Sequence, residues 1–225
     1  METSLLKRVP IFSQLEEEEL EKIRNLCVSK KYEKDRIILI EEDPGNSMFL
    51  IQKGRVKVSR MSDDGREVIL SILESGGFFG EMSLLDGKAR SASVTAVEDS
   101  QVLILRRGDF LKLMEDHPQI AIGLLKELAA RIRRSDTQIK SLSLQDAMGR
   151  VASTLAMLAE DSGKGKQNRV EIPRIPLQQD LANMSGTSRE TISRVFKYLE
   201  DEKLIIREGR KVIIPDYRKF RRMFS

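Results

Sequence analysis

Residues 80–92 read GEMSLLDGKARSA, and no other stretch constrains the architecture of this chain so closely. Gly80 lets the backbone approach a ligand, because a Cβ at that position would collide with it. The residues after Gly80 can form a short helical turn whose free N–H groups favour an anion. Arg90 then supplies a permanently charged planar fork and Ser91 a hydroxyl donor, and guanidinium bonds to phosphate are roughly twice as strong as neutral ones. Residues 80–91 are therefore predicted to form a phosphate cradle.

Glu81 adds a contact of another kind, since a carboxylate accepts hydrogen bonds from sugar hydroxyls. Phosphate donors beside one carboxylate describe a nucleotide with a free ribose 2′-OH. The alternative is that Gly80 and Gly87 are only turn residues and that Glu81 and Arg90 pair with each other. The candidate ligand-binding residues of the cradle are Gly80, Glu81, Met82, Ser83, Arg90 and Ser91.

The cradle lies in a region of short β-rich runs that extends to residue 105. Turn signals such as Asp63-Asp64-Gly65 separate the runs, and regular short strands with glycine-rich turns are typical of a β-barrel or β-roll. An acidic amphipathic helix is expected before them, over residues 14–27. The predicted strands are Arg36–Glu41, Ser47–Gln52, Arg55–Arg60, Glu67–Leu73, Ser91–Val97 and Gln101–Leu105.

A helix predicted from Pro118 to about Leu142 carries a narrow apolar seam. The seam residues recur at alternating intervals of four and three, the heptad spacing of a two-helix coiled coil, which predicts a homodimer. Packing against the chain's own roll is the alternative. Ser135 is the one polar residue on the seam, so it sets the register or contacts something bound at the interface. The seam consists of Ala121, Leu125, Leu128, Ile132, Ser135, Ile139 and Leu142.

Basic charge is concentrated toward the C-terminus. The chain holds 39 Lys and Arg against 35 Asp and Glu, a formal net charge of +4. Residues 163–225 hold 15 basic and 8 acidic side chains, a difference of +7, which leaves −3 for residues 1–162. This is the footprint of a nucleic-acid partner, with a merely solvated basic surface as the alternative. We expect two domains, residues 1–145 and 146–225.

The second domain is expected to begin with a helix at Ala147–Ala159, capped by Asp146, followed by a polar loop at 161–169. A helix-turn-helix pattern follows, with helices at Gln178–Met184 and Ser188–Leu199. Apolar residues at i, i+3, i+4 and i+7 bury one face of the second helix. Arginine bonds bidentately to guanine and glutamate accepts from cytosine, so the opposite face suits a G·C-containing DNA site. The candidate DNA-binding residues on that face are Ser188, Arg189, Glu190, Thr191, Ser193, Arg194 and Lys197.

Glu190 has a competing role at the start of this helix. The string Thr187-Ser188-Arg189-Glu190 fits a capping box, with Thr187 at the N-cap and Glu190 at the third helical position. Capping and base contact draw on the same carboxylate, so the free protein and its complex are expected to use it differently.

The β-roll, the seam helix and the strings at residues 79–87 and 89–92 together resemble the cyclic AMP receptor protein (Crp–Fnr) family. The resemblance covers nearly the whole chain. It implies an α+β fold, with an N-terminal cyclic-nucleotide-binding β-roll, a long dimerisation helix at about residues 118–143 and a C-terminal winged helix-turn-helix.

By this resemblance Glu81 binds ribose, and Arg90 and Ser91 bind phosphate. The family's adenine-contacting hydroxyl pair falls on Ser135 and Asp136. Ser135 keeps its hydroxyl and is the same residue that interrupts the seam. Asp136 departs from the hydroxyl pattern and adds a charge beside the base, which leaves the identity of the ligand open.

The resemblance also implies contacts with macromolecules. Base reading falls on Arg189, Glu190 and Arg194, at a half-site close to TGTGA. Residues 204–214 resemble the family's hairpin wing, so the DNA-binding candidates extend to Arg210 and Lys211 at its turn. RNA polymerase is a further partner that the resemblance implies.

The function expected from these features is a homodimeric transcription regulator whose DNA affinity is set by a cyclic nucleotide, with cyclic AMP the first choice. One alternative is the same regulator acting constitutively or with another ligand, such as a cyclic dinucleotide. Another is a nucleotide-sensing regulatory subunit whose C-terminal helices bind protein.

Several other classes are disfavoured by composition. With one histidine, His117, and one cysteine, Cys27, the chain is not expected to hold a metal site, an iron–sulfur cluster or an internal disulfide, and we expect no cofactor. A nucleophile–base pair and a P-loop are missing, so an enzyme is not expected. No stretch of the sequence approaches a membrane span or a signal peptide, which favours a cytoplasmic protein.

Overall fold

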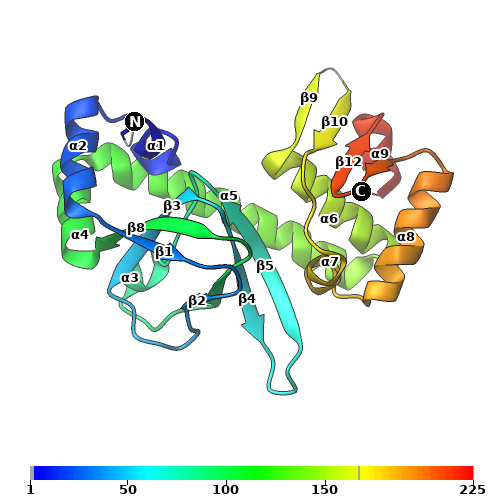
Figure 1. Ribbon diagram of the computed structural model, residues 1–225, viewed down its shortest axis with the longest axis horizontal. Helices are drawn as coiled ribbons and strands as arrows, with labels where there is room; N and C mark the ends of the chain where they lie inside the picture. The colour runs from blue at the N-terminus through cyan, green and yellow to red at the C-terminus, as the bar shows by residue number, and fades with distance from the viewer. Residues whose placement is uncertain (1–2, 167, 225) are drawn as a thin grey trace. The chain divides into compact units, whose positions relative to one another are not determined.

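The structure, a computed structural model, describes residues 3–166 and 168–224. It comprises two compact units that divide along the chain between Arg133 and Arg134. The long helix α5 (Pro118–Leu144) contributes residues to both. Helices and strands occur together in each unit, which confirms the α+β fold (Figure 1). No helix among the described residues is both long and apolar enough to cross a membrane.

The first unit is built on two four-stranded antiparallel sheets that form the β-roll, and Figure 1 shows helices gathered at one end of it. The strand orders are β1-β8-β3-β6 and β2-β7-β4-β5. All six predicted strands are present. They are β2 (Ile37–Leu39), β3 (Ser47–Lys53), β4 (Arg55–Met61), β5 (Glu67–Glu74), β7 (Ser93–Ala96) and β8 (Ser100–Arg106).

Two further strands, β1 (Val28–Tyr32) and β6 (Phe78–Phe79), were not expected. Four of the five residues of β1 are exposed, so it shows no alternation of buried and exposed positions. Strand β6 is too short to show any period. Both are held by long-range pairing, β1 with β8 and β6 with β3, which a local pattern does not reveal.

Strand β3 has apolar side chains on both faces and so joins two cores. Phe49 and Ile51 belong to the core inside the roll. Met48 and Leu50 belong to a second core, formed between the sheet and the helices. Those helices are α1 (Thr3–Leu6), the 3-10 turn η1 (Pro10–Phe12), α2 (Glu17–Leu26), α3 (Met82–Asp86), α4 (Arg107–Asp116) and the first part of α5.

Helix α2 is three residues shorter at its start than the predicted helix over residues 14–27. A capping box between Glu16 and Glu19 begins it, which explains the later start. Cys27 follows it as a buried residue, and burial raises the pKa of its thiol to about 11. His117 Nδ1 lies 2.9 Å from the Glu19 carboxylate, a structural contact.

In the second unit, α6 (Ala147–Ser162) follows the last residues of α5, and Asp146 caps α6 as predicted by accepting from the Gly149 N–H at 2.8 Å. The prediction of a polar loop at residues 161–169 is wrong in part. Strands β9 (Lys164–Lys166) and β10 (Arg169–Ile172) form there, because β10 pairs with the distant strand β12 (Lys211–Ile214). With β11 (Ile206–Glu208) they make a sheet ordered β11-β12-β10-β9, beside α6 and α9 (Tyr217–Phe224) in Figure 1.

The helix-turn-helix consists of α7 (Gln178–Ser185) and α8 (Arg189–Asp201), as predicted. Gly186 joins them with φ of +59°, a left-handed conformation that favours glycine. The Arg150 guanidinium of α6 donates to the carbonyls of Ser185 at 2.9 Å and Gly186 at 3.2 Å. The turn is therefore fastened to α6, and α8 is held in a defined orientation within this unit.

Candidate ligand cradle and nucleic-acid interface

Arg90 is fixed at the centre of the cradle, between the short helix α3 (Met82–Asp86) and β7. Its guanidinium donates from Nη1 to the Gly80 carbonyl at 2.7 Å and from Nη2 to the Ser47 carbonyl at 2.8 Å. Only 5 % of the residue is exposed. The Arg90 guanidinium is thus held in place by backbone carbonyls from two separate segments of the chain.

Two glycines make room for this guanidinium. A Cβ on Gly45 would lie 2.6 Å from Arg90 Cζ, and one on Gly80, where φ is +81°, would lie 2.9 Å from Arg90 Nη1. The sequence predicted that Gly80 admits a ligand. The structure corrects the reason given for this glycine. The space beside Gly80 is filled by the guanidinium of Arg90, the residue that is proposed to bind the ligand.

Two buried polar atoms of the cradle have no hydrogen-bond partner among the described residues. They are Arg90 Nε, a donor, and Glu81 Oε2, an acceptor. Burial lowers the pKa of Arg90, while the nearby Glu81 carboxylate opposes that shift. Buried polar atoms are nearly always satisfied, so an orphaned donor and acceptor together are typical of a site that receives a polar ligand.

Glu81 is paired with Arg131 of α5, a residue that the sequence analysis missed. Arg131 Nη1 donates to Glu81 Oε1 at 2.8 Å, and Nη2 donates to the Phe78 carbonyl at 2.8 Å. The Arg131 guanidinium also lies over the Phe78 ring, 4.6 Å from its centroid. Arg131 precedes Ser135 by one helical turn on α5, and this spacing was the only signal that pointed to it. The described ion pair of Glu81 is therefore with α5, and not with Arg90 as the alternative supposed.

The other candidates lie at the rim of the cradle or on α5. Ser83 is buried within α3, whereas Met82 and Ser91 are exposed, with the Ser91 hydroxyl 3.5 Å from Met82 Sδ. Ser135 and Asp136 are exposed residues of α5. The structure thus brings together Gly80, Glu81, Ser83 and Arg90, and it leaves the roles of all eight ligand candidates as predictions.

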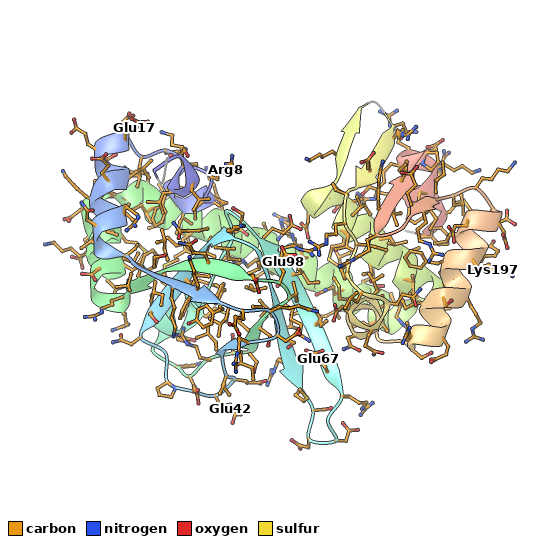
Figure 2. All side chains as sticks on the ribbon, in the orientation of Figure 1. Arg8, Glu17, Glu42, Glu67, Glu98 and Lys197 are labelled. Carbon is orange, nitrogen blue, oxygen red and sulfur yellow. The ribbon has the colours of Figure 1, made fainter. Side chains whose placement is uncertain are left out.

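Helix α8 presents a charged face, as its apolar period predicted. Ile192, Val195, Phe196 and Leu199 are buried on the opposite side. Arg189 and Lys197 make no hydrogen bond or salt bridge with the described residues, and Figure 2 shows Lys197 pointing away from the fold. Ser193 and Arg194 are also exposed, with the Arg194 guanidinium donating to Thr191 Oγ1 at 3.0 Å. Such a face is open to a large partner.

The start of α8 corrects the predicted capping box. Ser188, not Thr187, is the N-cap, and its hydroxyl accepts from the Thr191 N–H at 3.2 Å. Glu190 is then the second helical residue. A hydrogen bond from its own backbone N–H, with a second from the Ser188 hydroxyl, lowers the pKa of the Glu190 carboxyl.

Both candidates at the wing already have partners within the fold. Arg210 donates from Nε and Nη2 to the Ile175 carbonyl, at 3.0 and 2.6 Å. Lys211 pairs with Glu171 at 3.2 Å and Glu208 at 3.3 Å, and hydrogen bonds to these carboxylates raise its pKa. A phosphate contact would compete with these bonds, so the DNA-binding roles of Arg210 and Lys211 remain predictions.

Comparison with known families agrees with both units. Residues 29–117 match the cyclic nucleotide-binding domain, and residues 149–223 match the Crp-like helix-turn-helix domain. Among the described residues, no three His, Cys, Asp or Glu side chains are grouped as metal ligands.

Relatives with curated descriptions cover most of the chain. The cyclic AMP receptor protein of Thermus thermophilus is 36 % identical over 89 % of this chain and 89 % of its own length. The cAMP-activated global transcriptional regulator CRP of Haemophilus influenzae is 32 % identical over 84 % of each chain.

Solved structures share the fold. The Thermus thermophilus catabolite activator protein is 34 % identical, with a TM-score of 0.56 over 95 % of this chain and 97 % of the other. FixK2 from Bradyrhizobium japonicum has a TM-score of 0.77 over 88 % and 98 %, and at 22 % identity it bears on the fold alone. These matches confirm the family that the motifs indicated: the chain belongs to the Crp–Fnr family of cyclic nucleotide-responsive transcription regulators.

Proposed function

We propose that this protein is a cytoplasmic homodimer that binds a TGTGA-like palindrome and is controlled allosterically by a cyclic nucleotide, with cyclic AMP as the effector. In this proposal residues 1–145 form the nucleotide-binding and dimerisation domain, and residues 146–225 form the DNA-binding domain. By resemblance to the family, the protein bound at a promoter contacts RNA polymerase.

The orphaned pair in the cradle carries the proposal. A phosphate oxygen can accept from Arg90 Nε, and a ribose hydroxyl can donate to Glu81 Oε2, so a cyclic nucleotide satisfies both atoms at once. The Ser91 hydroxyl lies one residue beyond Arg90 and supplies a further donor. Ser135 and Asp136 are left for the base, and Gly80, Met82 and Ser83 shape the cradle.

Arg131 offers a route from the cradle to the dimer. Its guanidinium is already bonded to Glu81, so a ribose bound at Glu81 changes the surroundings of an α5 side chain. Along the same helix, the seam residues Leu125, Ile132 and Ile139 are between 62 % and 66 % exposed in the single chain. Burying each such side chain against a second copy contributes about 1–3 kcal/mol. Binding at the cradle and pairing at the seam thus act on one element.

DNA recognition is assigned to the charged face of α8. Arg189 and Arg194 reach guanines, Glu190 accepts from cytosine, and Lys197 neutralises phosphate. Ser188, Thr191, Ser193, Arg210 and Lys211 complete the proposed surface. In a dimer the two α8 helices meet half-sites about one helical turn apart, roughly 34–36 Å.

Calorimetry with cyclic AMP, cyclic GMP and cyclic dinucleotides, combined with gel shifts on a TGTGA palindrome, tests the proposal. Cyclic AMP should bind and should raise the affinity for the palindrome, and the palindrome should raise nucleotide affinity by the same factor, because the coupling is reciprocal. Sedimentation should show a dimer at micromolar concentration. If the protein sediments as a monomer both with and without nucleotide, the proposed allosteric control of a dimer is wrong.

One residue favours a second candidate. Asp136 places a carboxylate where the family carries a hydroxyl, and this favours a ligand other than cyclic AMP, or none. Tight sequence-specific binding that ignores every nucleotide in the panel would leave the DNA assignment intact and select this alternative. A protein that binds nucleotide but no DNA would instead select a regulatory subunit.

A further inference from the structure

The second unit contains a cavity of about 260 Å³ that is separate from the cradle and from the charged face of α8. Three helices line it: the last part of α5, the middle of α6 and the C-terminal helix α9. Its volume is just below the range of about 300–1,000 Å³ that is usual for pockets of drug-sized molecules, so it suits a smaller ligand.

The cavity exists because α6 carries small residues where it faces α9. Ala156 leaves accessible space that a larger side chain would fill, whereas Ala152, one turn earlier, is fully buried. Phe224 of α9 and Met157 of α6 supply the rest of the accessible apolar lining, whereas Phe220 is fully buried. An apolar, planar body suits such a surface.

The charged groups at this cavity are mostly cationic. Arg134, Lys140 and Arg221 line it, against the single carboxylate of Glu160. Arg221 pairs with Glu160, and Arg134 pairs with Asp161 at 3.2 Å. The Lys140 ammonium makes no hydrogen bond or salt bridge with any residue that the structure describes. Lys140 is thus the group left to receive an anion.

The side chain of Gln145 ties the three helices together beside this lining. Its Oε1 accepts from the hydroxyls of Ser141 at 2.7 Å and Ser153 at 2.8 Å, and its Nε2 donates to the Phe224 carbonyl at 2.9 Å. Every polar atom of the Gln145 amide is therefore bonded. The network fixes the positions of the three helices around a preformed space, which lowers the cost of ordering on binding.

We propose that this cavity is a binding site for a small amphipathic organic anion, with an apolar ring body against Phe224, Ala156 and Met157 and a carboxylate or phosphate on Lys140. This site lies outside the proposed nucleotide and DNA sites and does not depend on either.

The test uses the full-length chain with methyl-labelled methionine and observes Met157 by NMR during titration with naphthoate and, in parallel, naphthyl phosphate. The Met157 signal should shift in a saturable way, while the signal of Met48, buried in the first unit, stays in place. The tighter of the two probes identifies the head group. Neutral naphthamide should bind about fivefold or more weakly, because it lacks the charge that meets Lys140.

Two variants and a matched control separate the contributions. Lys140→Gln should reduce naphthoate to the affinity of naphthamide, whereas Lys126→Gln, fourteen residues earlier on α5, should change nothing. Ala156→Leu fills the cavity and should abolish the Met157 shift. The proposal is overturned by a Met157 signal that does not respond at millimolar probe, or by binding that is the same in parent and Lys140→Gln. Neither result bears on nucleotide or DNA binding, which are measured separately.

Discussion

The cradle and the charged face of α8 hold their functional groups in opposite ways. In the cradle, Glu81 and Arg90 are 2 % and 5 % exposed, and Arg131 and two backbone carbonyls engage most of their polar atoms. On α8, Arg189 and Lys197 are exposed and make no salt bridge with the described residues. In the cradle, tertiary packing holds the functional groups in place, whereas on α8 their positions follow from the helix alone.

This difference separates stability from binding. Removing a buried charged group leaves its partners unsatisfied, so a change in the cradle should damage folding and ligand affinity together. Removing an exposed, unpaired cation leaves the fold intact and should affect only the partner.

The largest effect is expected for Arg90→Leu. The carbonyls of Gly80 and Ser47 would lose their donors inside the roll, so the free energy of unfolding should fall by about 2–4 kcal/mol. Nucleotide affinity should fall more than tenfold, measured by calorimetry at a temperature where the variant is folded. Ser91→Ala, at an exposed neighbour, should keep full stability. Equal stability of Arg90→Leu and the parent would show that the buried bonds are not holding the cradle.

On α8, Arg194→Ala should weaken specific DNA binding by about 1–3 kcal/mol and relax the preference at one base pair. Lys197→Ala should instead weaken all sequences alike and reduce the slope of affinity against salt by about one. Gel shifts over a range of salt with single-base variants of the palindrome distinguish the two. Thermal unfolding of both variants should match the parent, and a stability loss as large as that of Arg90→Leu would end the contrast between the regions.

The ribose contact sharpens the comparison inside the cradle. If the 2′-OH donates to Glu81 Oε2, the 2′-deoxy form of the cyclic nucleotide should bind the parent about tenfold more weakly, the value of one bond to a charged group. In Glu81→Ala the two nucleotides should bind alike, although both bind less tightly. A deoxy penalty that survives in Glu81→Ala would assign the ribose to another residue.

The smallest effect is expected at the cap of α8. Ser188→Ala should lower the free energy of unfolding by about 1 kcal/mol, because the Thr191 N–H loses its acceptor. The Glu190 pKa should also rise toward its ordinary value, since one of the hydrogen bonds that lower it comes from Ser188. The pKa of Glu190 is lower in the folded protein than in the unfolded chain. The ionised carboxylate therefore stabilises the fold at pH values above the unfolded pKa, and this stabilisation is lost as the pH falls through the folded pKa. NMR titration of Glu190 in both proteins checks this, and Thr187→Ala is the matched control.

The sequence predicted most elements and missed a few for identifiable reasons. Alternation and turn signals found six strands of the roll, and the helical period found α7 and α8. Strand β9 fell inside the predicted loop at 161–169, because its residues Lys-Gly-Lys carry no alternation and only pairing with β10 makes it a strand. The capping residue of α8 was placed one position early, since both Thr187 and Ser188 suit an N-cap.

By itself, the sequence determined the family, the seam of α5 and the charged face of α8, because these depend on spacing within one segment. Only the tertiary structure decided how the cradle is built. Arg131 reaches Glu81 across fifty positions of the chain, Ser47 holds Arg90 across forty-three, and Gly45 leaves the space that Arg90 fills. No local period links such residues. Their contacts arise when strands and helices from distant segments pack around one core, and that packing also leaves one buried donor and one buried acceptor without a hydrogen-bond partner among the described residues.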